Sequence, residues 1–266
     1  MHIFMIGSGK LATFLGKQFK SRWGTQVHIT ATTTQANKLA QIEDWADQGV
    51  CWNATQPLEP YCPTHTDILF CAVAPQSRAD TSCWTNVAQA VVKLSPRFNK
   101  IIWISSTSVY ASPPTPATLT EQAPLQTEHL SPLVTAENIL AQGTPKDSTL
   151  ILRLAGLYGS AIYSLHKRYA FFQQQQSVLS PHTPQNMTSV ELVARSIFFL
   201  LDHPNLRRLE YLNICDLTHP TRQELADQIA RAADYPPVQF QGNNPGRSQN
   251  KIIASHRLIE LGFRFE

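Results

Sequence analysis

The sequence of 266 residues is poor in charged side chains. Charged residues make up 15% of the chain, the net charge is +3, and the longest basic run is His166–Arg168. Proteins that bind nucleic acid usually carry a dense basic patch. The low and mixed charge therefore argues against a nucleic-acid partner.

Long apolar runs are also absent. No stretch approaches the roughly 20 apolar residues that a membrane-spanning helix needs, so we expect no membrane partner. The first apolar stretch already looks like a strand of the folded domain at Ile3, and no secretory leader is expected before it. These features together favour a cytoplasmic location.

Paired cysteines are missing as well. The five cysteines are Cys51, Cys62, Cys71, Cys83 and Cys215, and none forms a C-x-x-C motif. Cys71 and Cys215 lie in apolar runs and are expected to be reduced core residues. Cys62 and His65 have a metal-like spacing, but no second pair accompanies them, so we expect surface-loop residues there and no metal site.

The stretch that organises the rest of the chain is its beginning. Residues 2–6 are mainly apolar and end in Gly7-Ser8-Gly9, and from Lys10 onward the apolar residues recur at helical spacing. This pattern predicts a buried strand, a tight turn and an amphipathic helix.

The turn matches the pattern G-x-G-x-x-A. Gly7 permits a sharp turn, Gly9 lets the backbone approach a pyrophosphate, and Ala12 is small enough for close helix–strand packing. The free N–H groups at the start of the following helix attract phosphate. We therefore predict a dinucleotide site, although a plain strand–helix turn is the alternative. Its phosphate-binding residues are Gly7, Ser8, Gly9, Lys10 and Leu11.

The predicted second strand, residues 26–31, lacks the acidic residue that usually holds the ribose hydroxyls of NAD. The sequence there continues through Thr32 and Thr33, and Lys38 follows one turn later. Hydroxyl groups and a lysine suit a 2′-phosphate, so NADP is slightly favoured over NAD. The alternative is that the threonines only cap a helix over residues 35–42.

Further elements alternate along the chain as a parallel α/β sheet requires. Strands are expected at residues 50–52, 67–74, 100–104 and 210–215, and helices at residues 80–94, 131–142 and 188–201. The strand over residues 67–74 ends in small residues, Ala72, Val73 and Ala74, over which a flat cofactor ring could lie. Thr221 and Glu224 form a capping-box pattern that predicts another helix start.

Several motifs beyond the first turn resemble one known family. They are S-S-T-S-V-Y at residues 105–110, T-E-Q-A-P at 120–124, I-L-R-L-A-G-L-Y-G at 151–159, and N-K-I-I at 250–253 followed by L-G-F at 261–263. Together they resemble the extended, NAD-dependent epimerase/dehydratase branch of the short-chain dehydrogenase/reductase superfamily. The resemblance covers almost the whole chain.

This resemblance implies a Rossmann-like, doubly wound parallel sheet with a small C-terminal substrate cap. An NAD(P)-binding domain is expected over residues 1–156, and residues 157–266 are expected to supply the cap and the last elements of the sheet. Ser105, Leu154 and Gly156 are additional cofactor-binding candidates. The resemblance also suggests a homodimer formed through the helices over residues 80–94 and 131–142.

The chain departs from the family at the catalytic Tyr-x-x-x-Lys pair. Counting back from Glu137, which matches a family glutamate, the Tyr and Lys positions fall on His129 and Leu133. Ser106 does match the serine that hydrogen-bonds the reacting oxygen. This is similar to atypical members of the superfamily. The catalytic candidates are therefore Ser106, His129 as a base, and Tyr110 as a proton donor.

A Tyr-x-x-x-Lys spacing does occur at Tyr163 and Lys167, but outside the expected place, and we interpret it as a chance pair. In the resembled branch this region contributes to the cap over the substrate. Tyr158, Tyr163, Lys167 and Arg247 are therefore substrate-binding candidates for an anionic or nucleotide-linked molecule. The alternative is an exposed basic helix face.

Two functions remain open. The first is an oxidoreductase or epimerase/dehydratase-like enzyme that transfers hydride to or from a nucleotide-sugar or a small carbonyl or hydroxyl compound. The second is a catalytically inactive NAD(P)-binding redox sensor or interaction protein, which the missing Tyr/Lys pair would allow.

Overall fold

The computed structural model describes residues 1–73, 82–127, 131–159, 165–203, 209–246 and 249–265. By its internal contacts the chain forms two compact units. The first comprises Met1–Val109, Leu125–Arg153 and Phe198–Leu212; the second comprises Tyr110–Pro124, Leu154–Ile197 and Asn213–Glu266. The units interleave along the sequence, and the division expected at residue 156 stays a prediction.

A seven-stranded sheet forms the centre of the first unit and has the order β10-β7-β5-β4-β1-β2-β3. Its strands are β1 His2–Ile6, β2 His28–Thr33, β3 Gln48–Cys51, β4 Thr66–Cys71, β5 Phe98–Ser106, β7 Thr149–Leu154 and β10 Glu210–Ile214. The pairings from β3 across to β5 are all parallel. The expected doubly wound parallel α/β fold is confirmed.

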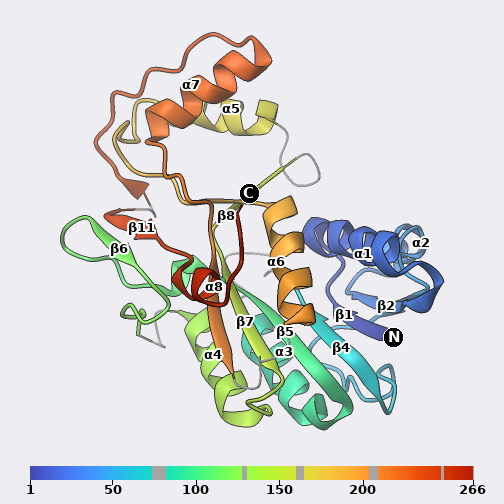
Figure 1. The fold of residues 1–266 in the computed structure, drawn as a ribbon. Coiled ribbons are helices and arrows are strands. Elements are labelled where there is room, and N and C mark those ends of the chain that lie inside the picture. The colour runs from blue at the N-terminus through green and yellow to red at the C-terminus, as the bar shows by residue number, and fades with distance from the viewer. Residues whose placement is uncertain (74–81, 128–130, 160–164, 204–208, 247–248, 266) are drawn as a thin grey trace. The chain divides into compact units, whose positions relative to one another are not determined.

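The direction of winding reverses between β1 and β4. From β1 the chain proceeds through α1 (Lys10–Trp23) to β2, whereas from β4 it proceeds through α3 (Ser82–Leu94) to β5 on the other side. Because crossovers between parallel strands are right-handed, the two helices cover opposite faces of the sheet. Helix α4 (Pro132–Gly143) packs against α3 (Figure 1).

Alternating side chains of the strands fill both faces. On one face, Phe4, Leu69 and Trp103 join Val91 of α3 and Leu140 of α4 in one buried cluster. On the other face, the ring of Phe19 in α1 lies 6.3 Å from that of Phe70 and 5.8 Å from that of Phe198 in α6 (Val190–Asp202). Burial on both faces explains why β1 and β4 are continuous apolar runs.

The second unit contains two short parallel pairs, β6 (Ala117–Leu119) with β11 (Lys251–Ile253) and β8 (Gly156–Tyr158) with β9 (Met187–Ser189). Helix α5 (Leu165–Gln175) packs against α7 (Arg222–Ala233). Tyr169 and Phe172 of α5 meet Ile229 of α7 in a buried cluster. Helix α8 (His256–Glu260) follows β11 near the end of the unit.

Some element boundaries differ from the sequence-based expectation. The second strand begins at His28 because Gly24–Gln26 form a 3-10 turn. The helix expected from residue 188 begins at Val190 because the residues before it pair as β9. The helix expected over residues 35–42 is a 3-10 turn, Ala36–Lys38, followed by the short α2 (Leu39–Glu43).

Cysteine burial corrects one expectation. Cys71 and Cys215 are buried, as predicted, but Cys62 is 5% exposed and belongs to the core under the sheet, not to a surface loop. In the described ranges, no three His, Cys, Asp or Glu side chains gather as metal ligands would. No helix of that part of the chain has the length and apolar character that a bilayer crossing needs.

The capping box at the start of α7 is present. The Thr221 hydroxyl accepts from the Glu224 N–H at 3.2 Å, and the Glu224 carboxylate accepts from the Thr221 N–H at 2.7 Å. Thr221→Ala should lower the free energy of unfolding by about 1 kcal/mol, because an N-terminal amide loses its acceptor. Chemical denaturation measures this change. Thr221→Ser, which keeps the hydroxyl, should retain most of the stability; an equal loss in both variants would contradict the capping role.

Candidate functional site

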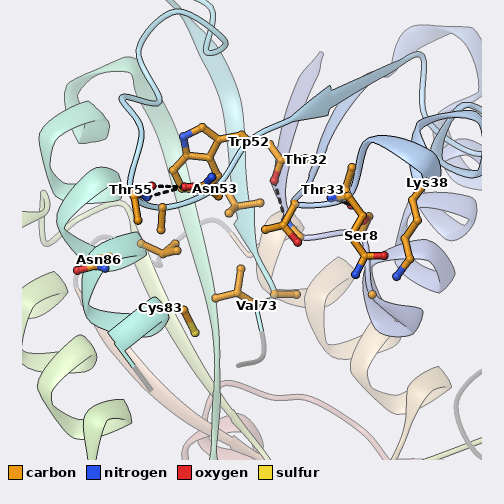
Figure 2. Close-up of a pocket in the computed structure, with 18 of the residues that line it drawn as sticks. Ser8, Thr32, Thr33, Lys38, Trp52, Asn53, Thr55, Val73, Cys83 and Asn86 are labelled. Atoms are coloured by element: carbon orange, nitrogen blue, oxygen red, sulfur yellow. Dashed lines mark hydrogen bonds between the residues drawn. The ribbon is translucent and has the colours of Figure 1, made fainter. Parts of the chain in front are cut away.

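A cavity of about 490 Å³ opens in the first unit, at the carboxyl ends of its parallel strands. Its walls come from the segments after β1, β2, β3 and β4 and from the start of α3: Ile6–Gly9, Thr32–Gln35, Lys38, Trp52–Thr55, Ala72, Val73, Ser82, Cys83, Asn86 and Val87. Ser8 and Lys38 lie on one side, and Cys83 and Asn86 on the other (Figure 2). The cavity lies where the winding reverses, the usual ligand position in open α/β sheets.

Gly7 makes the turn out of β1 and has a φ of +98°, a conformation that side chains rarely adopt. A Cβ atom there would lie 2.6 Å from the carbonyl oxygen of Ala72, which follows β4. The Gly7 N–H donates to the Thr32 hydroxyl at 3.0 Å (Figure 2). The first turn is thereby tied to the ends of both neighbouring strands.

Gly9 differs from Gly7, because its φ of −69° suits any residue and a Cβ there would meet nothing within 4 Å. It is the N-cap of α1, and as a glycine it has no side chain that could cap this end by a hydrogen bond. The first turn of α1 carries no acidic residue. The positive end of the helix dipole therefore lies at a turn whose N-cap residue leaves room for a ligand.

The segment after β2 combines hydroxyl groups with a lysine. Thr32 is buried and its hydroxyl receives the Gly7 N–H, so it braces the turn. Thr33 is also buried, and its hydroxyl accepts from the Gln35 N–H at 3.2 Å. Lys38 is the one charged residue among the described residues of the cavity wall, and no carboxylate is among them.

Sequence reasoning missed the wall after β3. The Asn53 side-chain oxygen accepts from both the N–H and the hydroxyl of Thr55, and the Trp52 indole N–H donates to the Gln56 carbonyl at 3.0 Å. These bonds fix a polar turn at the edge of the cavity (Figure 2). The Asn-x-Thr sequence directly after a short strand is the signal that could have found it.

At the end of β5, Ser105 and Ser106 have different surroundings. The buried Ser105 hydroxyl donates to Glu137 Oε1 at 2.6 Å. Glu137 is also paired with Arg153, Nη2 to Oε2 at 2.6 Å, and neither side chain is more than 3% exposed. Ser106 is half-buried, and its hydroxyl accepts from the Ser108 N–H at 3.1 Å. Ser105 therefore anchors the strand end, and Ser106 is the more accessible serine.

Tyr110 belongs to the second unit and is fully buried. Its hydroxyl donates to Asn213 Oδ1 at 2.6 Å. This environment gives Tyr110 a packing role, and its role as a proton donor stays a prediction.

Two cofactor-binding candidates, Leu154 and Gly156, and two substrate-binding candidates, Tyr158 and Lys167, also lie in the second unit. Leu154 is 3% exposed, the Gly156 N–H donates to the Asn186 carbonyl at 3.0 Å, and Lys167 is exposed on α5. Burial, together with the neighbouring Asp216 carboxylate, raises the pKa of the Tyr158 phenol to about 12. A phenol with so high a pKa stays protonated at neutral pH and donates hydrogen bonds.

Four predicted site residues lie outside the described residues: Ala74, His129, Tyr163 and Arg247. Their predicted roles stay predictions. Of the phosphate-binding candidates, Gly7, Ser8 and Gly9 line the cavity, and Lys10 and Leu11 begin α1. Ala72 and Val73, the candidates for contact with the cofactor ring, also line the cavity, beside Gly7.

No family model matches the sequence, and no curated protein matches it by sequence. Solved structures do share its fold. A functionally unknown conserved protein from Silicibacter pomeroyi has a TM-score of 0.76 at 19% identity, with 99% of this chain and 93% of that chain covered.

Two further neighbours were solved with NAD. The UDP-glucuronic acid 4-epimerase of Bacillus cereus, in complex with UDP-glucuronic acid and NAD, has a TM-score of 0.75 at 14% identity and covers 98% and 92% of the two chains. The dTDP-glucose 4,6-dehydratase of Bacillus anthracis, in complex with NAD, has a TM-score of 0.77 at 16% identity and covers 98% and 89%. At these identities the likeness establishes the Rossmann-like fold.

The two glycines of the turn should respond differently to the same substitution. Gly7→Ala should lower the free energy of unfolding by about 2 kcal/mol or more, because it adds a Cβ at positive φ and against a carbonyl oxygen. Gly9→Ala should change it by less than about 1 kcal/mol. Urea denaturation of both variants tests the difference, and equal losses would show that the turn is not constrained as described.

Proposed function

We propose that this protein binds NADP or NAD in the cavity of the first unit and acts as an oxidoreductase or epimerase on a nucleotide-linked or small carbonyl or hydroxyl substrate. The observation that carries the proposal is the start of α1. Its N-cap residue is a glycine and has no side chain to cap the first amides, its first turn has no acidic residue, and a Cβ at Gly9 would meet nothing within 4 Å. These are the requirements of a site for a diphosphate.

The electrostatics of the cavity support a polyanionic ligand. Lys38 and the dipole of α1 contribute positive potential, and the described walls hold no carboxylate to oppose it. A cavity of about 490 Å³ is within the range of sites that hold an organic cofactor. The NAD complexes of structural neighbours with the same fold are consistent with this proposal.

The segment after β2 favours NADP. The position where an acid would hold the ribose hydroxyls of NAD carries threonines, and the exposed Lys38 follows at the cavity edge. A carboxylate would repel a 2′-phosphate, whereas hydroxyl groups and an ammonium group can bind it.

In the proposed reaction the nicotinamide ring supplies hydride transfer. This chain contributes Ser106, whose accessible hydroxyl would hydrogen-bond the reacting oxygen of the substrate and polarise it. Ser105, held by Glu137, fixes the end of the strand that carries Ser106. A role for His129 as the base remains part of the proposal, because imidazole exchanges protons near neutral pH.

One observation favours a second candidate function, an NAD(P)-binding redox sensor. The position that corresponds to the family lysine is Leu133, an aliphatic side chain that is 8% exposed. It cannot hold a ribose hydroxyl or lower the pKa of a neighbouring base. The cofactor site would then serve to report the cofactor's redox state.

Cofactor choice is tested at Lys38. Isothermal titration calorimetry should show tighter binding of NADP than of NAD, and Lys38→Gln should weaken NADP about tenfold through loss of a charge-assisted hydrogen bond, with little effect on NAD. Lys17→Gln, on the exposed side of α1, is the matched control. An NADP affinity that Lys38→Gln leaves unchanged, or equal affinities of the unsubstituted protein for NADP and NAD, would exclude this preference. If neither cofactor binds, the site itself is overturned.

Catalysis is tested at Ser106. For an oxidoreductase, nicotinamide absorbance should change when the protein is given NADP or NAD with UDP-sugars or small hydroxyl compounds, or NADPH or NADH with carbonyl compounds. An epimerase returns the hydride within one turnover, so its activity is followed by NMR of the UDP-sugar product. Ser106→Ala should lower the rate by about 100-fold or more while cofactor affinity is retained. Turnover that survives this substitution unchanged would remove Ser106 from the reaction. Cofactor binding without turnover of any compound would favour the sensor instead.

A further inference from the structure

The second unit holds a cavity of its own, of about 270 Å³. It lies among α5, α7, the β8–β9 pair and the loop after β10, and its described wall residues all belong to the second unit. The walls combine an apolar part with a polar part. Met187, Leu225 and Ile229 form the apolar part, and Arg168, Asp216 and Tyr158 contribute to the polar part.

Arg168 has a defined position in the wall. Its Nη2 donates to the Met187 sulfur at 3.1 Å, and its guanidinium carbon lies 5.5 Å from the centre of the Phe172 ring. Phe172 is 1% exposed, so the guanidinium group packs on a rigid part of the core. A planar cation held in this way is suited to a carboxylate, which it can bind through two parallel hydrogen bonds.

Asp216 supplies the opposite charge. Its N–H donates to the Met187 carbonyl at 2.8 Å, which fixes the backbone at the cavity. Burial raises the pKa of the Asp216 carboxyl group, with Tyr158 as a hydrogen-bonding neighbour that opposes the shift. A partly desolvated carboxylate of this kind is stabilised by a cationic ligand group.

Size and charge both distinguish this cavity from the one in the first unit. The larger cavity has a lysine and no carboxylate among its described wall residues, which suits a polyanion, whereas here one arginine is matched by one aspartate. A diphosphate would meet Asp216 without a surplus of cations. The volume is also below the roughly 300 Å³ at which sites for drug-sized ligands begin.

We propose that this cavity binds a small zwitterion of the α-amino acid type with an apolar side chain. Its carboxylate would pair with Arg168, its ammonium group with Asp216, and its side chain would pack against Met187, Leu225 and Ile229. The proposal uses residues of the second unit only and does not depend on cofactor binding in the first.

The test is calorimetry on the full chain without cofactor, with L-phenylalanine, L-methionine and L-leucine as probes at up to millimolar concentrations. At least one should bind. Phenylpropionate, which lacks the ammonium group, and phenethylamine, which lacks the carboxylate, should each bind about tenfold more weakly than phenylalanine or not at all. Failure of all three amino acids to bind, or equal binding of an analogue that lacks one charge, would overturn the proposal.

Variants assign the binding to this cavity. Arg168→Gln and Asp216→Asn should each weaken amino-acid binding about tenfold or more, whereas Arg231→Gln, on the exposed surface of α7, should not. Thermal melting checks that each variant is folded, and Asp216→Asn serves alone if Arg168→Gln is not. Unchanged affinity in a folded variant, or Arg168-dependent binding of UDP-glucose in place of the amino acids, would contradict the assignment.

Discussion

The turn at Gly7 is the constraint on which the cofactor-sized cavity depends. Only a residue without a Cβ atom fits a φ of +98° so close to the Ala72 carbonyl oxygen. The hydrogen bond from the Gly7 N–H to Thr32 adds a tie to the second strand. Because the turn is sharp and fixed at both sides, α1 starts directly after the cavity-lining residues Ser8 and Gly9, with the positive end of its dipole at the cavity.

The two cavities differ in the charged residues of their walls. The cavity at the sheet edge has a helix dipole and a lysine without an opposing carboxylate on its described walls, whereas the cavity in the second unit has both Arg168 and Asp216 in its wall. Coulomb interactions are strong where water is partly excluded, so one unmatched charge changes which ligand a site prefers. The same principle explains why the Glu137–Arg153 pair, at most 3% exposed, serves structure and not ligand binding. The two charges of this pair neutralise each other, and the Ser105 hydroxyl donates a further hydrogen bond to the Glu137 carboxylate.

Much of the fold could be predicted because both faces of the central sheet are buried. Strands such as β1 and β4 must then be apolar over most of their length, and the amphipathic helices between them show the period of a helix. The short strands β6 and β9 could not be predicted in this way, because each has only three residues and its partner is far away in sequence. The burial of Cys62 was missed because the core cluster that it joins is built from strands and helices distant in sequence.

For the candidate site, the sequence alone determined the turn, the helix that follows it, the lack of an acid after the second strand, and a leucine, Leu133, where the resembled family would have its lysine. These are local properties, set by which residue types stand next to each other. Only the tertiary structure decided that Thr32 braces Gly7, that Tyr110 is buried, that Asn53 and Thr55 form a wall, and that Arg168 and Asp216 share a cavity. Each of these depends on contacts between segments distant in sequence, and such contacts arise only when the chain has packed.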